Sequence, residues 1–135
     1  MTDLNIYAEI LISAYEHPKH KATVKDANAA KHEENISCGD KIDIYLKIKD
    51  KKIAKAGFTG TGCIISMGSA DMLLDALEGK GVAEVVKMTK KDLLRIIGID
   101  PGPVRMHCAT LSLRAAKEAV FAYEGRKADA SVKEL

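Results

Sequence analysis

Three cysteines, Cys38, Cys63 and Cys108, are the residues of this chain whose chemistry is most informative. They are separated by 25 and 45 positions, and three is an odd number. An odd set of widely spaced cysteines is a poor disulfide framework, so thiolate or metal chemistry is the better interpretation. The neighbours of each cysteine then decide what that chemistry could be.

Each cysteine is expected at the boundary of a helix or strand rather than on an apolar face. Cys38 stands two positions before Asp40, Cys63 follows the sequence Gly-Thr-Gly at 60–62, and Cys108 follows His107. Cys63 and Cys108 lie near predicted helix N-termini, where the helix dipole favours a thiolate over a thiol. A thiolate is the form that binds metals and attacks persulfides.

Three thiolates leave one ligand position, for which His107 and Asp40 are the candidates. Sulfur donors completed by one nitrogen or oxygen suit either a zinc ion or an iron–sulfur cluster. Spacing alone does not choose between them, because the chain has no Cys-x-x-Cys pair. Taken singly, each residue has a simpler role: a small buried cysteine, an aspartate in a turn, a histidine near a helix cap. Their conjunction at predicted loops favours a site.

Periodicity predicts the elements that position these residues. Apolar residues at spacings of three and four predict a first helix that ends before Pro18, and a polar arm follows over about 19–34, with a weak edge strand near 32–37. Alternation over 41–49 predicts a half-buried strand, and Ala54, Ala56 and Phe58 predict its hairpin partner. The strand's inward residues are Ile42, Ile44, Leu46 and Ile48.

From residue 66 the period becomes helical. A stripe of Ala70, Leu73, Leu74 and Leu77 predicts one helix, residues from 82 a short second one, and a capping box of Thr89 and Asp92 a third. A last helix is expected from about 108 to 124, with Leu111, Ala115, Ala119 and Ala122 on one side, followed by a frayed tail over about 126–135. Strands followed by helices predict one α+β domain over 1–135, with a small antiparallel sheet covered by helices.

Composition excludes several classes of protein. The chain is 47% apolar and 30% charged with a net charge of +2, which is ordinary for a globular protein and gives no nucleic-acid or membrane footprint. No apolar run is long enough to span a bilayer, and the first ten residues lack the basic region of a signal peptide. A cytoplasmic location is therefore expected.

Three segments resemble the cysteine motifs of the IscU/NifU family of iron–sulfur scaffold proteins: NISCGD at 35–40, GTGCIIS at 60–66 and PVRMHC at 103–108. YEHPKH at 15–20 resembles the end of the family's first helix, and the similarity runs over about 6–124. The resemblance implies a three-stranded antiparallel sheet packed against several helices, with the cysteines at one exposed end. It implies Cys38, Cys63, His107 and Cys108 as metal or cluster ligands, with Asp40 as an alternative ligand that tunes cluster lability.

The same resemblance implies a scaffold rather than an enzyme. A cysteine desulfurase of the IscS/NifS type would supply sulfur, Fe²⁺ would supply iron, and the resulting [2Fe–2S] cluster would pass to apo iron–sulfur proteins. Among the cysteines, Cys108 is favoured as the persulfide acceptor and Cys38 is the alternative. The family's chaperone-binding stretch, Leu-Pro-Pro-Val-Lys, is matched only at Pro103 and Val104, so docking of an Hsp70-type chaperone is doubtful.

A second function uses the same ligands: a zinc-bound sulfur acceptor that stimulates a desulfurase, as in SufU-like relatives. Those relatives carry an insertion before the third cysteine and lack the preceding histidine, so the short spacing and His107 favour the IscU side. A purely structural zinc module is a weaker third interpretation. The sequence does not decide between a monomer and a homodimer.

Overall fold

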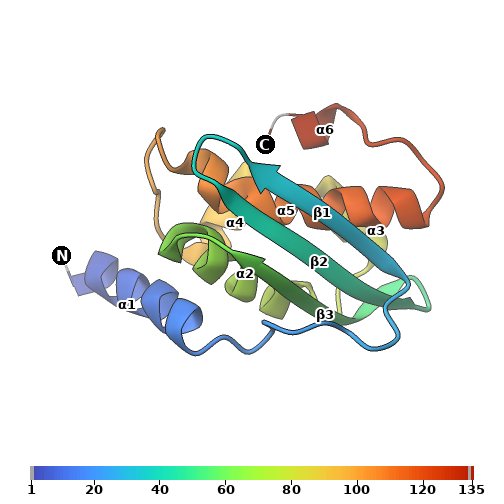
Figure 1. The fold of residues 1–135 in the computed structure, drawn as a ribbon, viewed down its shortest axis with the longest axis horizontal. Helices are drawn as coiled ribbons and strands as arrows, with labels where there is room; N and C mark the ends of the chain where they lie inside the picture. The colour runs from blue at the N-terminus through green and yellow to red at the C-terminus, as the bar shows by residue number, and fades with distance from the viewer. Residues whose placement is uncertain (1, 134) are drawn as a thin grey trace.

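A three-stranded antiparallel sheet, covered on one face by helices, forms the centre of the molecule (Figure 1). The computed structural model describes residues 2–133 and 135, with side chains from residue 6 onward. The strands are β1 (Ala29–Asn35), β2 (Asp40–Lys49) and β3 (Lys52–Thr61), in that order across the sheet. The predicted α+β architecture with a small antiparallel sheet is confirmed.

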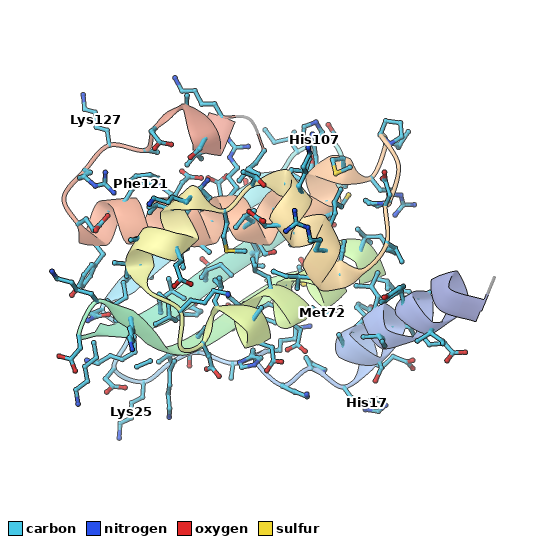
Figure 2. The ribbon with its side chains drawn as sticks, turned by 180° about the vertical axis from the view of Figure 1, so that it is seen from behind. His17, Lys25, Met72, His107, Phe121 and Lys127 are labelled. Atoms are coloured by element: carbon cyan, nitrogen blue, oxygen red, sulfur yellow. The ribbon has the colours of Figure 1, made fainter. Side chains whose placement is uncertain are left out.

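Two helices cover the sheet. α5 (Met106–Tyr123) packs on β1 and β2, α2 (Ile64–Leu77) packs on β3 and on α5, and α1 (Thr2–Glu16) packs against α2. Figure 2 shows this helical layer from behind, with its side chains filling the space above the sheet. None of the described helices is long and apolar enough to cross a membrane. The other helices of the described residues are α3 (Val82–Lys87), α4 (Lys90–Ile97) and α6 (Ala130–Lys133).

The central strand β2 follows the predicted alternation. Its four inward residues, Ile42, Ile44, Leu46 and Ile48, are all buried. Burial of a side chain of this size stabilises a fold by roughly 1.5–3 kcal/mol. The strand therefore anchors the sheet to the helical layer and fixes which of its ends carries the site.

The hairpin partner differs from the prediction at one residue. Ala56 and Phe58 are buried as expected, whereas Ala54 is exposed and Ile53 takes the inward position. The cause is a register shift beside Lys47 and Ile48, where β3 carries one residue more than β2. A bulge of this kind reverses the in–out alternation beyond it.

The helices follow their patterns with two exceptions. The α2 stripe is fully buried, and the Thr89–Asp92 capping box is present at the start of α4. On α5, Ala122 is exposed rather than part of the buried side. In α1, Leu11 is fully buried, whereas Tyr7 and Ile10 of the expected apolar stripe are exposed, because the helix contacts the rest of the protein on a narrow face. The side chain of Leu4, which also belongs to that stripe, lies outside the described residues.

Two segments expected to lack order are held by specific contacts. The polar arm is attached to α2, because the backbone N–H groups of Lys19 and His20 donate to Asp71 Oδ1 at 2.8 and 2.7 Å, and β1 begins at residue 29. Within the tail, α6 forms and buries Val132, and Leu135 is also buried. Val132 and Leu135 are thus buried, although no periodic pattern in this polar segment indicated it.

The strand pairing determines where the cysteines meet. Asn35 pairs with Asp40 across the tight β1–β2 turn, and Lys41 pairs with Thr61 near the end of β3. The turn at 36–39 and the segment that leads into α2 therefore lie side by side at one end of the sheet (Figure 1). The beginning of α5 reaches the same end.

Candidate metal and sulfur site

The turn between β1 and β2 presents the first cysteine. The backbone N–H groups of Cys38 and Gly39 both donate to the carbonyl of Asn35, at 3.3 and 2.8 Å. Gly39 has a φ of 75°, a left-handed conformation that glycine adopts without strain. The turn leaves Cys38 exposed to solvent.

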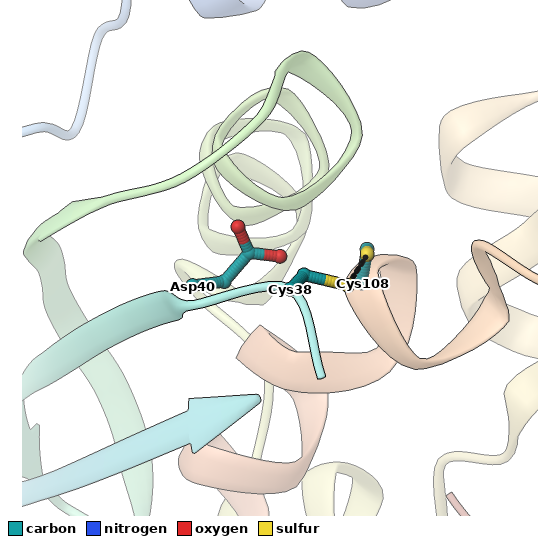
Figure 3. A group of neighbouring side chains, drawn as sticks. All are labelled: Cys38, Asp40 and Cys108. Carbon is teal, nitrogen blue, oxygen red and sulfur yellow. Dashed lines mark hydrogen bonds between the residues drawn. The ribbon is translucent and has the colours of Figure 1, made fainter. Parts of the chain in front are cut away.

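The first turn of α5 brings the third cysteine to this point. The sulfur atoms of Cys38 and Cys108 are 3.2 Å apart, although the residues are 70 positions apart in the chain. Asp40 completes the group: one ligand atom of each of the three residues lies within 4.8 Å of the others (Figure 3). Cys108 is fully buried, so the group has a buried floor and an exposed rim.

Asp40 is a buried carboxylate with an unused oxygen. Its Oδ1 accepts a hydrogen bond from the backbone N–H of Cys63 at 3.3 Å, while Oδ2 is buried and has no hydrogen-bond partner among the described residues. A buried charged oxygen without a partner is unfavourable. A cation held by Asp40 and the neighbouring sulfurs would provide that partner, so these residues fit a metal ion such as Zn²⁺ or Fe²⁺.

Glycine at position 62 lets the chain approach Asp40. A Cβ atom on Gly62 would lie 2.7 Å from Asp40 Oδ1 and would also collide with the hydroxyl oxygen of Ser66. Only a residue without a side chain permits this close contact. Gly62 thus holds the segment before α2 against the carboxylate and brings Cys63 to the site.

Cys63 caps the beginning of α2. Its sulfur accepts a hydrogen bond from the backbone N–H of Ser66 at 3.5 Å and lies 3.6 Å from the Ser66 hydroxyl. Burial raises the pKa of the Cys63 thiol, but hydrogen bonds from Ser66 and from the Ile65 backbone outweigh burial, so the pKa is lowered overall. The hydrogen bonds from Ser66 therefore favour the thiolate form of Cys63 more than the burial of this side chain alone would.

The pKa of the Cys108 thiol is shifted in the opposite direction, upward. Burial raises the pKa of its thiol strongly, and hydrogen bonds with Cys38 and Asp40 raise it further. In the metal-free protein Cys108 is therefore a thiol. A bound cation would reverse this preference, because a coordinating thiol loses its proton.

The site contains two residues whose roles the sequence did not indicate. The side-chain amide of Asn35 donates to the sulfurs of Cys38 and Cys108, at 3.3 and 3.8 Å, and the backbone N–H of Ser66 donates to Cys63. The sequence spacing could have indicated both contacts. Asn35 stands three residues before Cys38 in a turn, and Ser66 is the third residue of the helix that Cys63 caps.

His107, a predicted ligand, lies outside the group of three. Its side chain is exposed near the beginning of α5 (Figure 2) and lines a separate groove with His32, Glu33 and Glu34. Consecutive residues of a helix point about 100° apart, so His107 and the inward Cys108 face different directions. The structure thus brings together the side chains of Cys38, Asp40 and Cys108. Cys63 joins them through its backbone N–H, which donates to Asp40, and the imidazole of His107 lies apart.

A cavity opens beside Cys38, Asp40 and Cys63. Its volume is about 420 Å³, and it is lined by Cys38, Gly39, Asp40, Thr61, Gly62, Cys63, Val104 and Arg105. Val104 is 84% exposed, so an apolar side chain stands at the rim. The arrangement can hold a metal ion or a small inorganic group and can receive a reagent from solvent.

Known proteins resemble this chain over most of its length. It is 30% identical over 131 residues to the iron–sulfur cluster assembly scaffold protein IscU of Thermotoga maritima, covering 85% of this chain and 92% of that one. It is 29% identical to the zinc-dependent sulfurtransferase SufU of Bacillus subtilis, covering 89% and 92%.

The fold matches as well. The N-terminal NifU-like protein of Brucella abortus superimposes with a TM-score of 0.73, covering 90% of this chain and 96% of that one, at 14% identity. Residues 6–130 match the family described as NifU-like N terminal domain. Sequence and architecture agree, and the chain belongs to the NifU-like N-terminal domain family.

Proposed function

We propose that this protein is a scaffold on which an iron–sulfur cluster is assembled from iron and desulfurase-derived sulfur and then passed to apo-proteins. The observation that carries the proposal is that the ligand atoms of Cys38, Asp40 and Cys108 lie within 4.8 Å of one another, that Cys38 is exposed to solvent, and that Cys63 lines the same cavity as Cys38 and Asp40. Soft sulfur ligands mixed with one carboxylate suit a cluster that has to be released, since four buried cysteines would retain it.

The four ligands we propose are Cys38, Asp40, Cys63 and Cys108. His107 remains a candidate that would replace Asp40 once iron is present, and a rotation at the beginning of α5 would be needed to bring it in. The scaffold hypothesis predicts a [2Fe–2S] cluster, a cysteine desulfurase as sulfur donor and apo iron–sulfur proteins as recipients.

For the sulfur acceptor we favour Cys38 over Cys108. A desulfurase has to deliver its persulfide by direct contact with the receiving thiol, and Cys38 is exposed whereas Cys108 is fully buried. Exposure of the thiol governs such exchange reactions together with its nucleophilicity.

The second candidate function is a zinc-bound sulfur acceptor that stimulates a desulfurase without carrying a cluster. One observation favours it: Cys38, Asp40 and Cys108 lie within 4.8 Å of one another, and Cys63 lines the same cavity. With Cys63 as a further ligand these residues reach four, the number a tetrahedral zinc site takes, without the imidazole. The relative named as a zinc-dependent sulfurtransferase gives the same indication.

Anaerobic reconstitution tests the two functions. The protein is incubated with a cysteine desulfurase, cysteine and Fe²⁺, desalted, and analysed for visible absorption, iron and acid-labile sulfide. A scaffold develops the charge-transfer absorption of a cluster and then activates an apo-ferredoxin. A protein that stimulates the desulfurase only when loaded with Zn²⁺, and never gains colour under conditions in which a known scaffold does, has the second function instead.

A further inference from the structure

The two sulfur atoms at the centre of the site are close enough to react with each other. Cys38 Sγ and Cys108 Sγ are 3.2 Å apart, about 1 Å farther than the length of a disulfide bond. The amide of Asn35 contacts both sulfurs and holds them side by side. The third cysteine, Cys63, makes its sulfur contacts with Ser66 instead.

We propose that Cys38 and Cys108 act as a pair that converts a bound persulfide into free sulfide inside the site. The idea rests on the proposed function for its supply of sulfur. In this step the Cys108 thiol gives its proton to the outer sulfur of the Cys38 persulfide, and the Cys108 thiolate formed by that transfer attacks Sγ of Cys38. A bond forms between the two Sγ atoms, the bond to the outer sulfur breaks, and that sulfur leaves with the electron pair. The Cys108 proton goes to the departing sulfur, so one persulfide and one thiol give one disulfide and one hydrogen sulfide.

The geometry selects the inner sulfur as the target. Cys108 lies against Cys38 Sγ, the atom that stays attached to the protein when a second sulfur is added. The cavity of about 420 Å³ beside Cys38 offers space for that second sulfur, on the side where Asp40 and Cys63 also lie. Sulfide would therefore be released next to the groups that hold iron, rather than into solvent.

The different exposure of Cys38 and Cys108 assigns each of them to one step, either uptake of sulfur or release of sulfide. Cys38 stands in an exposed turn, in which Ile36 is 92% exposed, so a sulfur donor can reach the Cys38 sulfur. Cys108 is fully buried and inaccessible to the donor, which restricts it to the second step. After each turnover the disulfide has to be reduced by two electrons and two protons, which a dithiol reductant supplies.

The test uses the full metal-free chain, reduced and kept anaerobic with a chelator. A short pulse of inorganic polysulfide adds sulfur, rapid desalting removes the reagent, and the protein is followed in buffer without any thiol. Intact mass distinguishes a persulfide, which adds one sulfur atom, from a disulfide, which loses two hydrogens. Peptide mapping locates the bond, and a colorimetric assay measures the sulfide released.

We expect the wild type to release one sulfide for each Cys38–Cys108 disulfide that forms. In Cys108→Ser the persulfide should remain on Cys38, and sulfide should appear at least about tenfold more slowly, because the neighbouring thiol has a high effective concentration. Cys63→Ser, which removes a thiol outside the pair, should lose metal binding yet still form the disulfide. Cys38→Ser changes an exposed position and serves as a second variant of the pair in case Cys108→Ser does not fold. It should form no disulfide.

Three results would overturn the proposal: a wild-type persulfide that lasts as long as that of Cys108→Ser, sulfide release without a Cys38–Cys108 bond, or no uptake of sulfur at all. Reconstitution with Fe²⁺ and sodium sulfide separates this failure from failure of the scaffold function. If a cluster forms from sulfide while the persulfide persists, the pair is inactive and the scaffold stands. If no cluster forms from sulfide, the scaffold function fails and the disulfide result is judged on its own.

Discussion

Asp40 connects the start of β2 to the start of α2 through a hydrogen bond of 3.3 Å from the backbone N–H of Cys63. Its second carboxylate oxygen is buried and has no hydrogen-bond partner among the described residues. The residue is thus oriented by one oxygen and left incomplete at the other. In the metal-free protein such an oxygen costs stability, and a bound cation removes the cost.

Replacing Asp40 by Asn should separate these two effects. The amide oxygen can still accept from Cys63, but the negative charge is gone. We expect Zn²⁺ affinity to fall at least about tenfold, as is typical when a metal site loses a supporting group. The free energy of unfolding of the metal-free protein should stay level or rise by about 1 kcal/mol, since a buried charge is removed. Competition titration with a zinc chelator and denaturant unfolding measure the two quantities.

Asp43→Asn is the matched control for this change. Asp43 lies on the same strand, its side chain is 41% exposed, and its carboxylate pairs with His32 at 3.0 Å. It should leave Zn²⁺ affinity unchanged. Equal affinities of Asp40→Asn and the wild type would mean that the carboxylate is not a ligand.

Gly62→Ala should disturb the site through packing alone. The added methyl group would lie 2.7 Å from Asp40 Oδ1, so the segment before α2 has to move away from the carboxylate. Overpacking of this kind costs about 1–3 kcal/mol of unfolding free energy, and Zn²⁺ affinity should fall with it. Gly81→Ala is the control, because its Cβ would meet the nearest atom only at 3.7 Å. If both variants are equally stable, the close approach at Gly62 is not needed.

Cys63→Ser distinguishes a site for cluster assembly or sulfur transfer from a purely structural zinc site. Serine is a favourable residue at a helix N-cap, so the hydroxyl that this substitution introduces can replace the sulfur as the acceptor for the Ser66 N–H. The metal-free variant should melt within a few degrees of the metal-free wild type in circular dichroism, while losing tight Zn²⁺ binding and cluster formation. Complete loss of folded structure in the variant would indicate that the metal site holds the fold together.

The sequence pointed to Cys38, Cys63 and Cys108 as one site, because all three fall at predicted element boundaries beside glycines or polar residues, and it offered Asp40 and His107 as the further ligand. In the structure the sulfurs of Cys38 and Cys108 are in contact, and Cys63 lines the same cavity as Cys38. The choice between Asp40 and His107 depends on which way the side chain next to Cys108 points. That direction is set by the packing of α5 on the sheet, which no local pattern reveals.

The fold was predictable where one face of an element is buried. Strand β2 and helix α2 have complete apolar patterns, and both lie where the patterns place them. Ala54 was misassigned because a bulge depends on pairing between strands, so the β3 sequence read alone does not reveal it. No local pattern indicates α6, because Val132 and Leu135 are isolated apolar residues, whose burial depends on a space left by other elements.

A pair of carboxylates on the sheet face near α5 provides a prediction about pH. Glu118 of α5 lies beside Glu33 of β1, with Arg114 3.5 Å from Glu118 and 3.8 Å from Glu33, and with Lys31 3.9 Å from Glu118. Burial raises the pKa of Glu118 to about 7, helped by a hydrogen bond with Glu33 and by its charge, while Lys31 and Arg114 act in the opposite direction. In the unfolded chain this carboxyl titrates near 4.5.

Because the folded protein holds this proton more tightly, Glu118 stabilises the fold fully below pH 4.5 and loses that contribution as pH rises through about 7. We expect Glu118→Gln, which cannot ionise, to flatten the dependence of the unfolding free energy on pH between 5 and 8. At pH 8 the variant should be more stable than the wild type by about 1 kcal/mol, a value reduced for solvent screening. Glu84→Gln, at an exposed position on α3, should keep the wild-type profile. Urea unfolding at several pH values measures the effect, and parallel profiles for Glu118→Gln and the wild type would show that this carboxyl titrates normally.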